Sequence, residues 1–87
     1  MKFETTYTSR EHRYWLGLEV TSSRHFAAIP VSNRMVDYAE YYALVDDEYR
    51  AFLADETAAV AFAESCRRRE RDDRLFMKPG TDRGVPR

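Results

Sequence analysis

The amino-acid sequence predicts an α+β fold: an antiparallel sheet of four to five strands, connected as a meander, with two helices packed on one face. Three observations lead to this prediction. The first half of the 87-residue chain alternates apolar and polar side chains at period two, the period changes at Asp46 to that of a helix, and the predicted strands are joined by short connections. A chain of this length forms one domain, which we assign to residues 1–78.

The first two strands are predicted for residues 2–8 and 14–20, with a polar turn between them. Alternate residues of the first strand share one face: Phe3, Thr5 and Tyr7. The second strand has a longer apolar set on one face: Tyr14, Leu16, Leu18 and Val20. Both patterns are typical of half-buried strands, because successive side chains point to opposite faces of a sheet.

Two more strands are predicted for residues 25–31 and 36–44. Pro30 has no N–H group to donate, so the third strand should lie at an edge of the sheet or end at this residue. A short reversal at residues 32–34 follows, because Ser and Asn side chains bond their own main chain.

Acidic residues mark the starts of two helices. Asp46, Asp47 and Glu48 supply a capping oxygen and negative charge for the first helix, and Asp55 begins the second in the same way. The second helix carries an apolar stripe at helical spacing: Ala59, Phe62, Ala63 and Cys66. The apolar run 75–77 could add a fifth strand or pack on the sheet. The breaker-rich residues 79–87 are expected to form a flexible tail.

The predicted sheet carries more aromatic side chains than two short helices can cover. Beyond the core-facing residues it holds Trp15, Tyr38, Tyr41 and Tyr42. One face is therefore expected to be aromatic and solvated, or to meet a partner.

The composition excludes several classes of function. The chain has 14 basic and 15 acidic side chains and a net charge of −1, so no global field draws it to DNA or to an anionic membrane. Its three glycines stand too far apart to form a phosphate-binding loop. The single cysteine, Cys66, cannot form an internal disulfide or a zinc cluster, and its place on an apolar stripe predicts a buried, inert thiol.

Histidine spacing does not indicate a metal site either. His12 and His25 fall on different predicted elements, and a site that joins them with Glu19 has no support from their spacing. We therefore expect no enzyme, no cofactor and no metal. The chain has neither a signal-like start nor a long apolar run, so we expect a cytoplasmic protein without a membrane anchor.

Acidic and tyrosine side chains alternate between residues 37 and 49. Tyrosine offers a large contact area at low entropy cost, and acidic groups steer a basic partner. We expect a basic protein to dock on these residues: Asp37, Glu40, Tyr41, Tyr42, Asp46, Asp47 and Glu48. Tyr41 is the better candidate for direct contact, because Tyr42 shares its face with Val36 and Leu44.

The adjacent tyrosines Tyr41 and Tyr42, beside Glu40, Asp46 and Asp47, give this segment a character that resembles bacterial immunity proteins. Such proteins block a basic nuclease toxin by covering it with an acidic surface. The resemblance is confined to this segment. It implies an inhibitory role for a non-enzymatic interaction module of a bacterial cytoplasm.

Two other functions stay open. The aromatic sheet faces of two copies could pair, giving a homodimer with a structural or ligand-binding role. Alternatively, a run of arginines could contact nucleic-acid phosphates, although the net charge makes this less favoured. The arginines of this run are Arg67, Arg68, Arg69 and Arg71.

Overall fold

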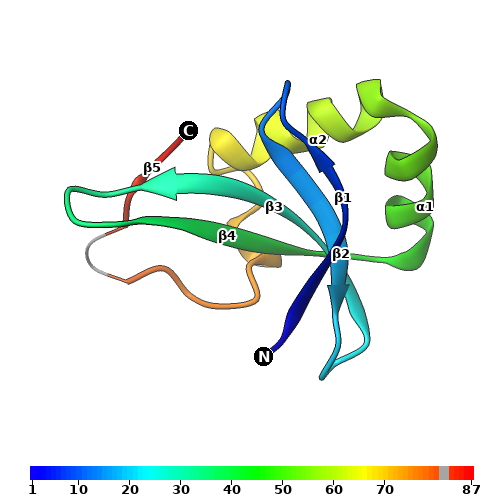
Figure 1. The fold of residues 1–87 in the computed structure, drawn as a ribbon, viewed down its shortest axis with the longest axis horizontal. Coiled ribbons are helices and arrows are strands. Elements are labelled where there is room, and N and C mark those ends of the chain that lie inside the picture. Colours follow the sequence, from blue (N-terminus) through cyan, green and yellow to red (C-terminus); the bar gives the residue numbers. More distant parts are fainter. Residues whose placement is uncertain (81–82) are drawn as a thin grey trace.

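The computed structural model describes residues 1–80 and 83–87 and has the α+β fold that the sequence predicts (Figure 1). Its elements follow in this order: β1 (Phe3–Ser9), β2 (Tyr14–Glu19), β3 (Arg24–Ser32), β4 (Asp37–Leu44), α1 (Asp46–Ala54), α2 (Glu56–Arg67), the 3-10 turn η1 (Asp72–Arg74) and β5 (Val85–Pro86). Strands β1 to β4 form an antiparallel meander, and β5 pairs with β3.

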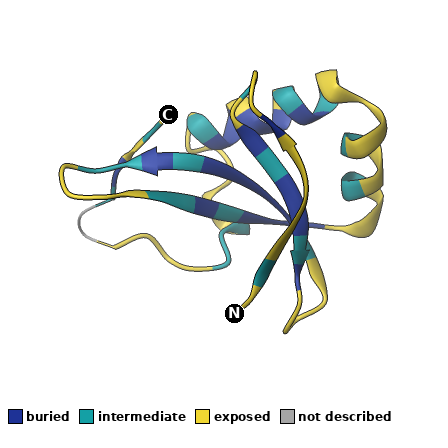
Figure 2. Cartoon of the chain, viewed as in Figure 1, coloured by how far each residue is buried: buried dark blue, intermediate teal, exposed yellow. Residues whose placement is uncertain are grey.

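The sheet is strongly twisted, so that the β1–β2 hairpin crosses the β3–β4 hairpin in Figure 1. Both helices pack on the face that carries the apolar residues of β2, β3 and β4, as the burial pattern in Figure 2 shows. The buried core on this face consists of Tyr14, Leu16, Ala27, Ile29, Val31, Tyr42, Leu44, Ala59, Phe62, Ala63 and Cys66. The predicted stripe of α2 supplies its last four members.

Aromatic side chains of the chain itself cover the opposite face of the sheet. The Phe3 ring stacks on Tyr41 at 3.8 Å between centroids, and Phe76 meets Phe3 edge-on at 5.3 Å. Phe26 and Ala28, which lie beneath these rings, are completely buried. The aromatic face expected to be solvated or partner-covered is thus largely covered by the chain's own N-terminal strand and by the segment after η1.

A β-bulge in β1 makes this closure possible. The register with β2 shifts between Thr5 and Tyr7, so one extra residue, Thr6, is inserted. Phe3 therefore faces the aromatic side, whereas the Tyr7 hydroxyl reaches Glu56 of α2. The prediction that Phe3 and Tyr7 share a face is wrong for this reason. The Thr6 hydroxyl meets the Leu16 carbonyl and the Tyr49 hydroxyl instead.

Pro30 lies inside β3 rather than at its end. The pairing of β3 with β2 ends at Ala28, so the N–H that Pro30 lacks would face a side where β2 has already stopped. The Pro30 carbonyl on that same side accepts the Arg87 N–H at 2.9 Å. The prediction that the third strand lies at an edge or ends at Pro30 is therefore wrong, because β3 is a central strand that continues to Ser32; Pro30 is tolerated since β2 has stopped on the side where its N–H is missing.

The C-terminal residues differ from the expected flexible tail. Residues 83–87 return to the sheet, where β5 pairs with Val31 and Ser32, and Arg83 binds the buried Glu40. The apolar run 75–77 does not supply the fifth strand. Leu75 forms a single bridge to Tyr42, and the strand is β5 instead. The part of the tail prediction that falls on residues 81 and 82 lies outside the described residues.

Glu19 gives the fold a dependence on pH. Its buried carboxylate accepts the backbone N–H groups of Lys2, Thr21 and Ser22 at 2.7 to 3.0 Å. A hydrogen bond from the Ser22 side chain, followed by these backbone bonds, lowers the pKa of Glu19 from 4.5 to about 2 against the opposing effect of burial. A pKa that is lower in the folded state stabilises the fold fully above 4.5, and this stabilisation is lost as the pH falls towards 2.

We therefore expect the urea midpoint of the protein to fall between pH 4.5 and 2 more steeply than that of a Glu19→Gln variant. Chemical denaturation at a series of pH values measures both curves. A constant difference between the two proteins across this range would contradict the role assigned to Glu19.

Candidate functional site

Two of the residues expected on a partner-binding surface belong to the core instead. Glu40 is 7% exposed and Tyr42 is completely buried. The Tyr42 hydroxyl donates to Glu40 at 2.8 Å, and Arg83 holds the same carboxylate through two nitrogens at 2.7 and 3.0 Å. The period of β4 explains the correction, because Glu40 and Tyr42 fall on the face that the helices cover.

The three acidic residues at the start of α1 each have a partner within the chain. Asp46 lies 2.9 Å from the His25 ring, Asp47 pairs with Arg50, and Glu48 accepts from Arg74 at 2.7 Å. Glu48 also accepts the backbone N–H of Val45, so it closes the N-terminus of the helix. A strand rises about 3.3 Å per residue, which puts this group about 30 Å along the chain from Asp37. The seven predicted residues therefore do not form one continuous surface.

The arginines of the alternative nucleic-acid patch are largely used within the fold. Arg67 donates to the carbonyls of His12 and Arg13, Arg69 donates to Gly84, and Arg71 donates to the Ser65 hydroxyl. Arg68 forms an ion pair with Glu70 at 2.8 Å. The four arginine side chains therefore point in different directions, and they do not form a single cationic surface for a phosphate backbone.

Cys66 is buried in the core. Burial raises the pKa of its thiol to about 12, with the nearby arginines opposing this effect only in part. The thiol is therefore protonated at neutral pH and is a poor nucleophile.

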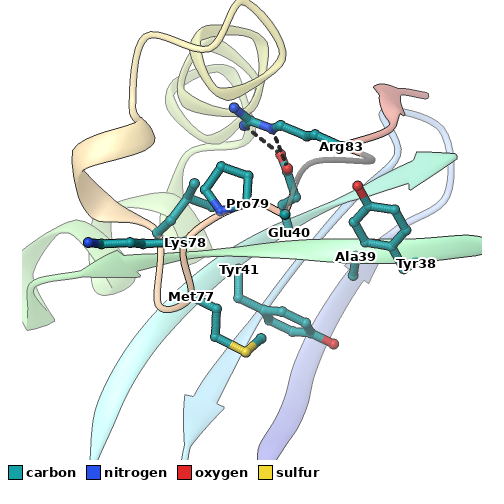
Figure 3. A pocket seen from close by; sticks show the side chains of 10 residues that line it. Tyr38, Ala39, Glu40, Tyr41, Met77, Lys78, Pro79 and Arg83 are labelled. Atoms are coloured by element: carbon teal, nitrogen blue, oxygen red, sulfur yellow. Dashed lines mark hydrogen bonds and ion pairs between the residues drawn. The ribbon is translucent and has the colours of Figure 1, made fainter. Parts of the chain in front are cut away.

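A groove runs along the outer edge of β4 (Figure 3). Its volume is about 290 Å³. It forms because the chain touches β4 at Leu75 and Phe76 and then diverges from the strand. We call this site the edge groove. One wall of the edge groove is formed by β4, with Tyr38, Ala39 and Tyr41. The segment that faces the strand forms the other wall, with Met77, Lys78 and Pro79.

The backbone of Ala39 points into the edge groove. Along β4, alternate residues direct their N–H and C=O groups to the same edge. The outer edge is identified by the Tyr41 carbonyl, which accepts the Phe76 N–H at 3.0 Å, and by the Ala43 carbonyl, which accepts from Arg74. Ala39 lies in the same series, and no hydrogen bond joins its backbone groups on this side to any residue in 1–80 or 83–87.

One wall of the groove is fixed by an ion-pair network. Arg83 bridges Glu40 and Asp72, with an Arg83 Nη1 to Asp72 Oδ2 distance of 2.7 Å. The hydrogen bonds that Arg83 donates to Asp72 and Glu40 raise the pKa of Arg83, and the bond from Arg83 lowers the pKa of Asp72, so both Arg83 and Asp72 stay charged. The Tyr38 hydroxyl also accepts the Gly84 N–H at 2.6 Å. The groove is therefore preformed.

The sequence indicates residues on one wall of this groove and none on the other. Tyr41 lines the groove, and Asp37 lies at the start of the same strand with an exposed side chain; their contact with a partner stays a prediction. The facing segment, Met77 to Pro79, falls in a short apolar run and in the predicted tail. The pairing of Glu40 with Arg83 joins positions far apart in the chain, and no local pattern indicates it.

No family model, curated protein or solved structure matches this chain. Neither α1 nor α2, nor any other helix in the described ranges, has the length and apolar character needed to cross a membrane.

Proposed function

We propose that this protein is a non-catalytic interaction module that binds an extended, basic segment of a partner protein along the edge groove. One observation carries the proposal: the Ala39 backbone offers a donor and an acceptor to the groove, between the rings of Tyr38 and Tyr41. An added strand would satisfy these groups, as in β-strand addition at a sheet edge. Side chains of the added segment would then alternate between the groove and solvent.

The apolar walls support an anchored rather than a purely electrostatic contact. Met77 is 54% exposed and lies on the same side of β4 as the Tyr41 ring, whereas Pro79 lies on the other side of the strand (Figure 3). An apolar side chain of the partner segment that enters beside Met77 and Tyr41 buries surface on both of them. Such an anchor contributes roughly 25 cal/mol for each Å² of apolar surface removed from water.

Charge gives the groove a direction. The exposed Asp37 lies two residues before Ala39, whereas Lys78 lies at the end away from Tyr38 (Figure 3). The Glu40 and Asp72 carboxylates are already paired with Arg83, so they are not free to bind an incoming cation. A basic side chain of the partner is therefore expected to meet Asp37, and this pair should contribute more to orientation than to affinity.

A selection from a displayed library of linear peptides, made against the full chain, tests the proposal. We expect the selected peptides to be extended and basic and to carry an apolar anchor. Their Kd should rise by about tenfold or more in Ala39→Pro, which removes the Ala39 N–H donor, and in Met77→Lys, which places a positive charge in the wall and repels a basic peptide. Met77 is exposed, so the second variant should fold even if the first does not.

Two matched variants separate the edge groove from the other acidic residues. Asp37→Asn should weaken the selected peptides, whereas Asp47→Asn, which removes an exposed carboxylate from the start of α1, should leave their Kd unchanged. Peptides that bind Ala39→Pro and Met77→Lys as tightly as the natural sequence would overturn the proposal. The same holds if Asp47→Asn proves the more damaging change.

A further inference from the structure

Three metal-ligating side chains converge where the β1–β2 turn meets α2. The turn carries Glu11 and His12, and Glu56 is the first residue of the helix. The His12 Nε2 atom lies 3.3 Å from Glu56 Oε1 and 3.9 Å from Glu11 Oε2. One ligand atom from each residue lies within 4.8 Å of those of the other two.

These separations suit a small divalent cation. Ligands about 2.0 Å from a tetrahedral Zn²⁺ stand about 3.3 Å from one another, which equals the distance between His12 and Glu56. Glu11 is exposed at the turn, so it can close the remaining gap by rotation of its side chain. One imidazole and two carboxylates favour Zn²⁺ over the harder Mg²⁺ and Ca²⁺, and three protein ligands leave one position for water.

The turn that carries two of these ligands is held in place. The His12 N–H donates to the Ser9 hydroxyl at 3.2 Å. Arg67 of α2 donates to the carbonyls of His12 and Arg13, and Arg13 adopts a positive φ of 55°. Because the backbone is fixed on both sides of His12, little ordering is needed to bring its ring to the cation.

A second observation points to a ligand at the same place. Tyr14 is 1% exposed, and its hydroxyl has no hydrogen-bond partner among the described residues. The Tyr14 ring packs beside that of Tyr7, with 6.2 Å between the ring centroids. The Tyr7 hydroxyl lies 3.5 Å from Glu56 Oε2. A buried donor without a partner is unusual, and a water or other acceptor held by an ion at this site would satisfy it.

We propose that Glu11, His12 and Glu56 bind one divalent transition-metal ion of the Zn²⁺ class, with Tyr7 and Tyr14 as outer-shell hydroxyls. This ligand set shares only His12 with the combination of His12, His25 and Glu19, which the spacing of these residues does not support. His25 stacks on Tyr49 and contacts Asp46, and Glu19 is saturated by backbone N–H groups. The site is distinct from the edge groove and does not depend on its function.

Zn²⁺ titration of the full chain, in competition with a chromogenic chelator, tests this site. We expect one equivalent to bind to the natural sequence, and His12→Ala and Glu56→Gln to raise the Kd by about tenfold or more. Tyr14→Phe should raise it by a smaller factor. His25→Ala is the matched control and should leave the Kd unchanged, since this histidine lies on another strand.

Nuclear magnetic resonance of the two imidazole rings gives an independent readout. Added Zn²⁺ should shift the ring signals of His12 and leave those of His25 unchanged. Equal Zn²⁺ affinity of the natural sequence and of His12→Ala and Glu56→Gln would overturn the proposal. Equal loss of affinity in His25→Ala would also overturn it.

Discussion

Replacement of Arg83 by methionine is expected to destabilise the fold by about 3 to 5 kcal/mol, because it leaves the Glu40 carboxylate buried without its ionic partner. The Glu40 side chain is only 6% exposed, and that of Arg83 only 13%. The Tyr42 hydroxyl remains bonded to Glu40 in the variant, but it supplies no charge. Urea denaturation followed by circular dichroism measures the change.

Two further variants show whether the effect comes from the buried charge. Adding Glu40→Gln to Arg83→Met removes that charge, so the double variant should be more stable than the single one. Arg68→Met breaks the exposed pair with Glu70 and should leave the denaturation midpoint unchanged. If Arg83→Met is no more damaging than Arg68→Met, the buried network does not stabilise the fold as described.

Substitution of alanine for Gly17 should have a similarly large effect, destabilising the protein by about 3 kcal/mol. A Cβ atom at this position would lie 2.0 Å from the Glu4 carbonyl oxygen of β1 and 2.7 Å from the Phe26 ring. The carbonyl is part of the backbone, so β1 and β2 must separate to admit the methyl group. Because β1 also carries Phe3 over the aromatic face, the packing of Phe26 should loosen as well.

Gly80→Ala provides the matched control for this substitution, since a Cβ atom at Gly80 meets nothing within 4 Å. Its denaturation midpoint should remain that of the natural sequence. Near-ultraviolet circular dichroism should also report a loss of aromatic packing in Gly17→Ala alone. Equal midpoints for the two alanine variants would contradict the close approach of β1 to β2 at Gly17.

The alternation of side chains was enough to predict the strands and helices, but not which face each residue of β1 occupies. Residues 2–8 follow period two without a break, yet Thr6 forms a bulge that reverses the face after Thr5. A bulge depends on what each face meets in the folded protein. The Tyr49 partner of Thr6 lies 43 positions away, so the local sequence does not contain this information.

Only the wall of the edge groove that belongs to β4 could be predicted from the sequence. Tyr41 was correctly assigned to the face opposite the helix-covered one. The same alternation placed Glu40 and Tyr42 on the covered face, but the acidic character of Glu40 outweighed this pattern in our expectation. The carboxylate is buried because Arg83 reaches it from the C-terminal segment, 43 positions further along the chain. Contacts between such distant residues form the second wall of the edge groove.

Amide hydrogen exchange measures most directly whether Ala39 presents an unpaired backbone edge to the groove. In the free protein, the Ala39 N–H should exchange at least about tenfold faster than the N–H groups of Glu40 and Tyr42, which face β3. A selected peptide should slow exchange at Ala39 and leave Asp47 unchanged. Protection of Ala39 equal to that of Glu40 in the free protein would show that the edge is already occupied, and would contradict the account.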